Sequence, residues 1–173
     1  MTSEFDVFER AWRSDEWNHY QGFLTIYAIL YNQPEDEVVK LLRQREPNFV
    51  PVSRFLDDEF KTCVVMAYDE IATTRAYAMD YGLYDSFGDP RFNQWIKSVT
   101  RDEALHFYNC MQVIGLRHRN RIPEITSLIS ELIDWDLGGN SYSGTFVLDH
   151  EGYYFTPEFL QKCGKLITGY FDR

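Results

Sequence analysis

The chain has 173 residues, of which 45% are hydrophobic, and this is enough for one domain with a substantial core. Its formal net charge of −10 argues against a nucleic-acid partner, because the phosphates of DNA or RNA would repel such a surface. It contains no apolar run of about 18 residues, so no membrane span is expected, and the acidic segment 1–10 lacks the apolar region of a secretory signal.

Helical signals dominate the sequence and predict an all-α protein. The first long helix is expected over 4–31, where apolar side chains recur at helical spacing without a proline, and the segment 32–34 ends it. A short helix is expected over 35–45. A second long helix is predicted over 53–81, with Gly82 as its C-terminal stop.

A turn is predicted over 84–90, and the third long helix over 89–116. The rest of the chain is less regular. There we expect a helix over 122–135, a loop over 136–144, a segment over 145–155 that is either extended or coil, and a last helix over 156–169 that begins at a Thr-Pro cap.

The three cysteines, Cys63, Cys110 and Cys163, lie far apart and show no metal-binding spacing. We therefore expect buried free thiols in a reducing compartment and a cytoplasmic location.

Two of the four histidines follow a glutamate by three residues, each within the pattern Asp-Glu-x-x-His. These pairs are Glu16 with His19, and Glu103 with His106. Residues three apart share one face of a helix, so each pair directs a carboxylate and an imidazole toward the same point. The alternative for either pair alone is a solvated Glu–His pair on a helix surface.

The spacing of a third glutamate, Glu70, brings it to the same point. Glu70 and Glu103 differ by 33 positions, and their midpoint falls in the predicted turn. Two antiparallel helices joined there place both glutamates at one level, about 24 Å from the bend at 1.5 Å per residue. Glu16 reaches that level if the connection after the first helix returns the chain to the same end.

Carboxylates that bridge two cations, with one imidazole for each, define the dinuclear sites of ferritin-like bundles. Mixed Glu and His ligation with open positions suits iron or manganese better than zinc alone. The sequence thus predicts two iron ions, with manganese as the alternative, held by five side chains: Glu16, His19, Glu70, Glu103 and His106.

These motifs resemble those of the soluble acyl-ACP desaturases of the stearoyl-ACP type, a family of the ferritin-like di-iron superfamily. Residues 10–19, RAWRSDEWNH, resemble the family's R-x-W-T-x-E-E-N-R-H. Residues 70–73, EIAT, resemble E-R-A-T, and residues 101–106, RDEALH, resemble D-E-x-R-H. The resemblance covers roughly 10–114, and it implies one ferritin-like domain over 1–173 with its core at 4–116.

The resemblance also implies catalytic roles for Thr73 and Asp102. Thr73 falls where the family keeps a hydroxyl beside the dioxygen site, and its alternative role is a hydrogen bond back to a helix carbonyl. Asp102 matches a carboxylate that orients the histidine of the neighbouring helix, here His19. For Asp15 and Asp69, a solvated helix face is the preferred interpretation.

The family takes a sixth ligand, a glutamate, from a helix that precedes the first motif, and this sequence has only 15 residues before Glu16. The chain is therefore a truncated copy, borrows a helix from a partner, or uses Glu158. An open apolar groove would favour a homodimer. Acyl carrier protein could bind a basic patch, although its acidity conflicts with the net charge; the patch would consist of Arg43, Arg45, Arg117, Arg119 and Arg121.

Three functions remain open at this stage. The first is a desaturase-like oxidase that uses dioxygen on a carrier-bound acyl chain, with electrons from a ferredoxin-like donor. The second is a non-catalytic or degenerate metal-binding scaffold that needs a partner to complete the site. The third is iron sequestration.

Overall fold

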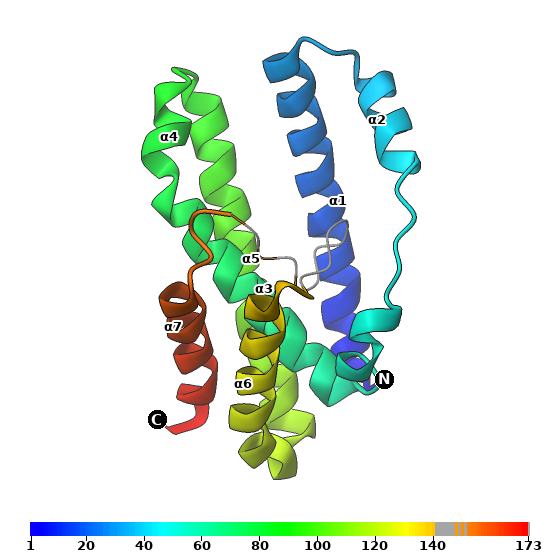
Figure 1. Ribbon diagram of the computed structural model, residues 1–173, viewed down its shortest axis with the longest axis vertical. Helices are drawn as coiled ribbons and strands as arrows, with labels where there is room; N and C mark the ends of the chain where they lie inside the picture. Colours follow the sequence, from blue (N-terminus) through cyan, green and yellow to red (C-terminus); the bar gives the residue numbers. More distant parts are fainter. Residues whose placement is uncertain (141–147, 149, 151, 173) are drawn as a thin grey trace.

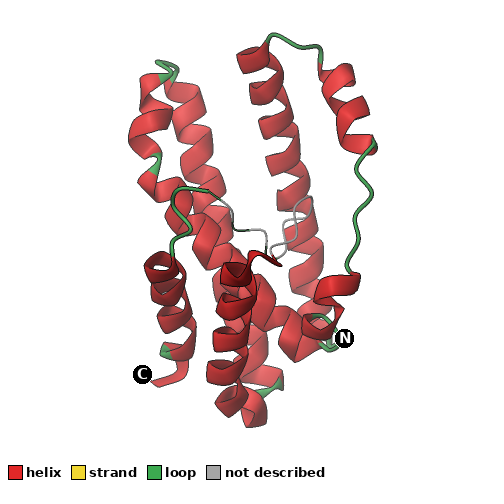
Figure 2. Ribbon diagram, in the orientation of Figure 1, coloured by secondary structure: helices red, strands yellow, loops and turns green. Residues whose placement is uncertain are grey.

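The chain forms a bundle of α-helices in the computed structural model, which describes residues 1–140, 148, 150 and 152–172. Three long helices make its frame: α1 (Ser3–Tyr31), α3 (Glu59–Met79) and α5 (Pro90–Arg117) (Figure 1). The described residues contain no β-strand (Figure 2). The predicted all-α class is confirmed.

Local sequence signals begin and end the long helices. The Thr2 hydroxyl accepts a hydrogen bond from the Phe5 amide at the start of α1. Asn32 directly follows the last residue of α1 and caps it in a left-handed conformation with φ of 50°. Asp89 caps α5 through the Arg91 amide, and Pro90 occupies the first helical position. These bounds agree with the predicted helices over 4–31 and 89–116.

The second long helix starts later than predicted. Residues Val50–Phe55 form a separate 3₁₀ turn, η1, in which the Ser53 hydroxyl bonds the Val50 carbonyl. Asp58 is extended and caps α3 through the Lys61 amide at 2.9 Å. Burial of Phe55 in the core holds the 3₁₀ turn apart from α3.

The connection between α3 and α5 is also more helical than predicted. Helix α3 ends at Met79, and a short helix, α4 (Tyr81–Ser86), covers most of the expected turn. Gly82 lies inside α4, so the prediction that it ends the second long helix is wrong. The glycine that needs a positive φ is Gly88, at 74°, and it makes the tight turn before α5.

The remaining elements are shorter. Helix α2 (Glu35–Arg43) confirms the short helix predicted over 35–45, and it packs against α1. After α5 follow η2 (Arg119–Glu124), α6 (Ile125–Trp135), the π-helical turn η3 (Asp136–Asn140), α7 (Pro157–Thr168) and η4 (Tyr170–Asp172). Thr156 caps α7 as predicted. The predicted loop over 136–144 is helical in its first part, since η3 occupies Asp136–Asn140. Residues 141–144 of that loop, and residues 145–147, 149 and 151 of the undecided segment, lie outside the described residues.

The hydrophobic core lies around the first two-thirds of α3. Helices α6 and α7 pack against each other and against this part of α3 (Figure 1). All fully buried side chains of α3 fall between Glu59 and Ala72. Glu70 is therefore placed near the edge of the core, where α1 and α5 also meet. The three cysteines are buried and free, as expected.

None of the helices in the described part of the chain is long and apolar enough to cross a membrane.

Candidate metal centre

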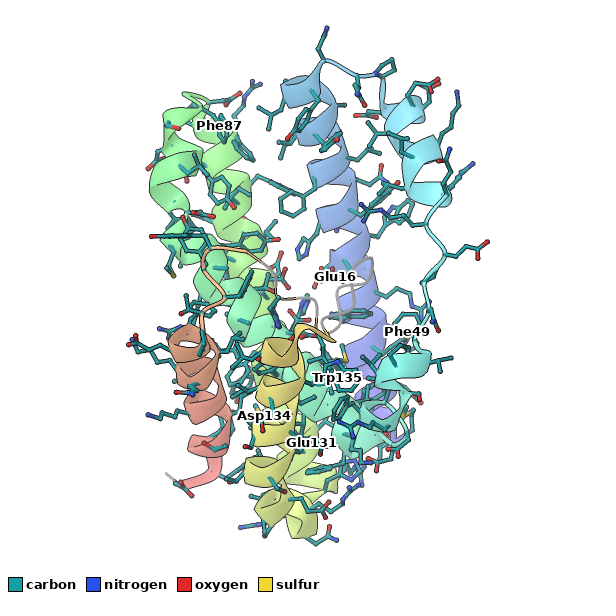
Figure 3. The ribbon with its side chains drawn as sticks, viewed as in Figure 1. Glu16, Phe49, Phe87, Glu131, Asp134 and Trp135 are labelled. Atoms are coloured by element: carbon teal, nitrogen blue, oxygen red, sulfur yellow. The ribbon has the colours of Figure 1, made fainter. Side chains whose placement is uncertain are left out.

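Three helices bring the predicted metal-ligating residues together. Glu16 of α1, Glu70 of α3, and Glu103 and His106 of α5 each contribute one ligand atom to a group in which all atoms lie within 4.8 Å of one another. Nδ1 of His19 lies 3.4 Å from Oε1 of Glu16 and 3.6 Å from Oε1 of Glu103. Figure 3 shows Glu16 midway along α1. The five side chains therefore meet at one place, and their role as ligands remains a prediction.

Both imidazoles direct the same nitrogen at the carboxylates. Nδ1 of His106 lies 3.3 Å from Glu103, 3.5 Å from Glu70 and 3.8 Å from Glu16. Since ligand atoms sit about 2.0–2.2 Å from a first-row metal ion, neighbouring ligands on one ion are about 3–4 Å apart. The observed separations match that spacing.

The outer nitrogens of the two rings face aspartates that belong to the opposite motif. Nε2 of His19 lies 3.4 Å from Asp102, which agrees with the orienting role that the resemblance implies. Nε2 of His106 lies 3.1 Å from Asp15. The side chain of Asp15 is 40% exposed, so it is partly solvated as preferred, but it also contacts His106 because α1 and α5 face each other closely enough for contact in both directions.

Three of the four clustered residues are buried, and the carboxylates and imidazoles shift one another's pKa values. Glu103 is 5% exposed and His106 is 2% exposed. Burial raises the pKa of Glu103 to about 8. The hydrogen bond to His106 lowers this pKa, whereas the neighbouring carboxylate of Glu70 raises it further. Burial disfavours the charged ring of His106, but hydrogen bonds to Glu103 and Glu70 outweigh it and raise the pKa to about 11. Protons thus supply positive charge that a metal ion would otherwise provide.

The hydrogen bonding of His19 is a second observation that fits a metal ion at this centre. Nδ1 of His19 is buried and has no hydrogen-bond partner among the described atoms, although it faces two carboxylates. An imidazole lone pair against carboxylate oxygens is repulsive unless a proton or a cation lies between them. Carboxylates plus imidazoles suit iron, manganese and zinc, so the donor set does not by itself select one metal.

A cavity of about 240 Å³ borders the centre. Its lining includes Thr73, as the resemblance implies, and also the aromatic side chains of Trp12 and Tyr77. The indole N–H of Trp12 donates a hydrogen bond to Oε1 of Glu70 at 2.8 Å. It is Thr74, rather than Thr73, that bonds back to the Glu70 carbonyl, at 2.7 Å.

Asp69 is buried and lines this cavity, so its preferred solvated role is wrong. The reason is that α3 is covered on several sides by α5, α6 and α7, and more than one stripe of the helix faces inward. The same cavity is lined by His150 and Phe155 from the segment before α7, which nothing in the helical spacing indicated.

The structure excludes Glu158 as the source of the sixth metal ligand. Glu158 is exposed on α7 and pairs with Lys162 at 2.8 Å. Two members of the predicted basic patch are also engaged: Arg117 pairs with Glu4, and Arg121 pairs with Asp58 and Glu124.

Comparison with protein-family models, with curated protein sequences and with solved structures gives no match.

Proposed function

We propose that the chain is a di-iron oxidase or oxygenase that uses dioxygen on an acyl substrate, similar in this respect to the acyl-ACP desaturases. The observation that carries the proposal is the meeting of three glutamates and two histidines from α1, α3 and α5 beside one cavity. Three carboxylates and two imidazoles from separate helices correspond to five of the six ligands of a ferritin-like dinuclear site.

At such a site, some residues would bind the metal ions and others would orient the imidazole ligands. Glu16, Glu70 and Glu103 would hold the ions together with the two imidazoles, and Asp15 and Asp102 would keep those rings in the ligating tautomer. When bound, two ferrous ions supply electrons for the reduction of dioxygen. Thr73 lines the cavity, and its hydroxyl would stand beside a small ligand bound there.

The proposal of an acyl substrate is supported by an apolar hollow on the surface of the bundle. The hollow encloses about 560 Å³ between α1 and α2, and Phe23, Leu24, Val38 and Leu41 are among its lining residues. Phe23 stacks on Tyr77 with ring centroids 5.9 Å apart, and Tyr77 lines the metal cavity. The stacked rings of Phe23 and Tyr77 thus link the lining of the hollow to the lining of the metal cavity.

Anaerobic loading with ferrous iron followed by dioxygen tests the proposal. We expect two irons per chain by elemental analysis and an oxo-bridged ferric absorption after oxygen is added. Glu103→Gln should lower the bound iron, while Glu131→Gln, on the exposed surface of α6, should not (Figure 3). Fewer than one iron per wild-type chain, with no ferric absorption, would contradict the proposal.

The partners belong to the same proposal: a second copy of the chain, an acyl carrier protein and a ferredoxin-like electron donor. Exposed apolar residues at the end of α1, Ile29, Leu30 and Tyr31, support self-association. Light scattering of the purified chain checks the homodimer, and acyl-ACP turnover with a reduced ferredoxin checks the other two partners.

A non-catalytic scaffold is the second candidate. Among the described residues, the group of ligand atoms draws its carboxylates from three helices, and α7 adds none. A chain that binds metal yet does not react with dioxygen would favour this candidate. Iron sequestration instead predicts many irons per assembly and no acyl ligand.

A further inference from the structure

His150 occupies a place that the centre described above does not explain. It lies in the segment that precedes α7, and its side chain is only 6% exposed. It lines the same cavity as Glu16, Glu70 and Glu103. It is not one of the four residues whose ligand atoms lie within 4.8 Å of one another. The ring therefore borders the cavity without belonging to that group.

One nitrogen of the His150 ring is committed to a carboxylate behind it. Nδ1 lies 2.9 Å from Oδ2 of Asp136, at the start of η3. The hydroxyl of Tyr68 donates to the same oxygen at 2.8 Å. Because Asp136 is buried and held by Tyr68, it fixes the direction in which the Nδ1–H of His150 points.

Two aromatic rings fix the plane of the imidazole. Tyr68 meets it edge-on with centroids 5.3 Å apart, and Phe155 packs beside it at a tilt of 44° with centroids 4.9 Å apart. The other nitrogen, Nε2, lies on the side of Asp69, 3.7 Å from Oδ1. Asp69 also lines the cavity. The ring thus has one nitrogen anchored in the core and one nitrogen on the cavity side.

We propose that His150 is a proton-transfer residue of the metal cavity, oriented by Asp136 and Tyr68, and that it exchanges protons through Nε2. The inference rests on the proposed dioxygen chemistry. Carboxylates lie on both sides of the ring, Asp136 at Nδ1 and Asp69 near Nε2, so a proton on either nitrogen has an oxygen acceptor beside it. Loss of the Nε2 proton leaves the neutral Nδ1–H tautomer, which keeps its bond to Asp136, so the ring need not turn over.

With two ferrous ions bound, the reduction of one dioxygen to hydrogen peroxide would take two electrons from the iron and two protons from the protein or from water. His150 gives one of the protons from Nε2, and water in the cavity gives the other. Bulk water then returns a proton to the ring.

The experiment compares wild type with His150→Asn, because asparagine keeps a donor toward Asp136 but cannot relay a proton at neutral pH. Bound iron is counted after anaerobic loading, and ferric absorption is followed after mixing with dioxygen. We expect two irons per chain in both proteins and a rate of ferric formation about 100-fold lower in the variant, the size typical of a lost acid–base group. Added imidazole should restore part of the rate.

The matched control is His118→Asn, which changes the histidine that contacts Glu59 at the far end of α5. It should react at the wild-type rate. Nitrogen NMR of the metal-free wild type provides a readout apart from reactivity: we expect a proton on Nδ1 of His150, and a loss of that preference in Asp136→Asn. This measurement remains available if His150→Asn does not fold.

Each outcome separates the two proposals. An His150→Asn variant that reacts at the wild-type rate, or a wild type without a proton on Nδ1, overturns the role of His150 and leaves the metal centre intact. A variant that loses iron shows instead that His150 supports or ligates the metal, which also overturns proton transfer. A wild type that binds no iron overturns the proposed function itself.

Discussion

The carboxylate of Asp15 on α1 lies 3.1 Å from Nε2 of His106 on α5. In the opposite direction, Asp102 on α5 lies 3.4 Å from Nε2 of His19 on α1. Each Asp-Glu-x-x-His segment therefore orients the imidazole of the other, and the two segments act as one unit.

This reciprocity predicts that Asp15→Asn and Asp102→Asn each weaken metal binding. An amide cannot hold the ligating tautomer as a carboxylate does, and loss of such a partner lowers affinity about 10- to 100-fold. Ferrous or cobalt titration measures the change. Asp134→Asn, on the exposed face of α6, is the control and should bind as the wild type does (Figure 3). Equal affinity in all three variants would mean that the reciprocal contacts do not support a metal.

The metal-free protein should lose stability as the pH rises from about 5 to 9. Glu103, with its pKa raised from 4.5 to about 8, keeps a proton in the folded state that the unfolded chain releases. His106, with its pKa raised from 6.5 to about 11, does the same at higher pH. Both contributions are complete below the unfolded pKa and are lost as the pH approaches the folded one.

Thermal unfolding at pH 5.5, 6.5, 7.5 and 8.5 measures this effect, and Tm should fall along the series. Saturating metal ion should remove the trend, because a cation replaces the displaced protons and binds more tightly as the pH rises. Glu103→Gln should flatten the metal-free curve. A Tm that rises over this range would contradict the assignment of raised pKa values at the centre.

Close contact between α1 and α5 depends on Gly22. A Cβ atom at Gly22 would lie 2.0 Å from Cζ2 of Trp95, a ring held by Phe23 with centroids 5.0 Å apart. Gly22→Ala should therefore lower the free energy of unfolding by about 1–3 kcal/mol, as overpacking does. Chemical denaturation measures it.

Gly82 is the matched control for that substitution. Apart from its chain neighbours and the backbone of its own helix, no atom of the described residues lies within 4 Å of a Cβ built at Gly82, which is inside α4. Gly82→Ala should be neutral or stabilise by up to about 1 kcal/mol, because alanine favours helix. A similar loss from both substitutions would indicate that the Trp95 contact is not the cause.

The hydroxyl of Thr73 should affect dioxygen chemistry more than metal binding. Thr73→Val removes the hydroxyl at nearly constant volume, whereas Thr73→Ser keeps it. We expect both variants to bind wild-type amounts of iron, and only Thr73→Val to form ferric product more slowly, by about 10-fold or more. Stopped-flow absorption measures the rates. If the serine variant is as slow as the valine variant, packing rather than the hydroxyl is responsible.

Local signals account for the parts of the fold that were predicted well. The caps at Thr2, Asp89 and Thr156 begin helices through side-chain contacts with residues two or three positions away. The level of Glu70 and Glu103 follows from equal distances to one bend, which chain geometry alone imposes. The break between η1 and α3 was not predictable in this way, because it depends on how Phe55 is buried.

Sequence spacing by itself determined the existence of the three long helices and the common level of Glu70 and Glu103, because helical periodicity and bend position are local properties. The arrival of Glu16 and His19 at that level depended on how the chain returns after α1. Tertiary structure alone decided that Asp15 contacts His106, that Asp69 is buried and that His150 lines the same cavity as Asp69. Asp136 and His150 owe their partner Tyr68 to a contact across 68 or more positions of the chain. No periodicity encodes such contacts, since they arise only when separate helices pack.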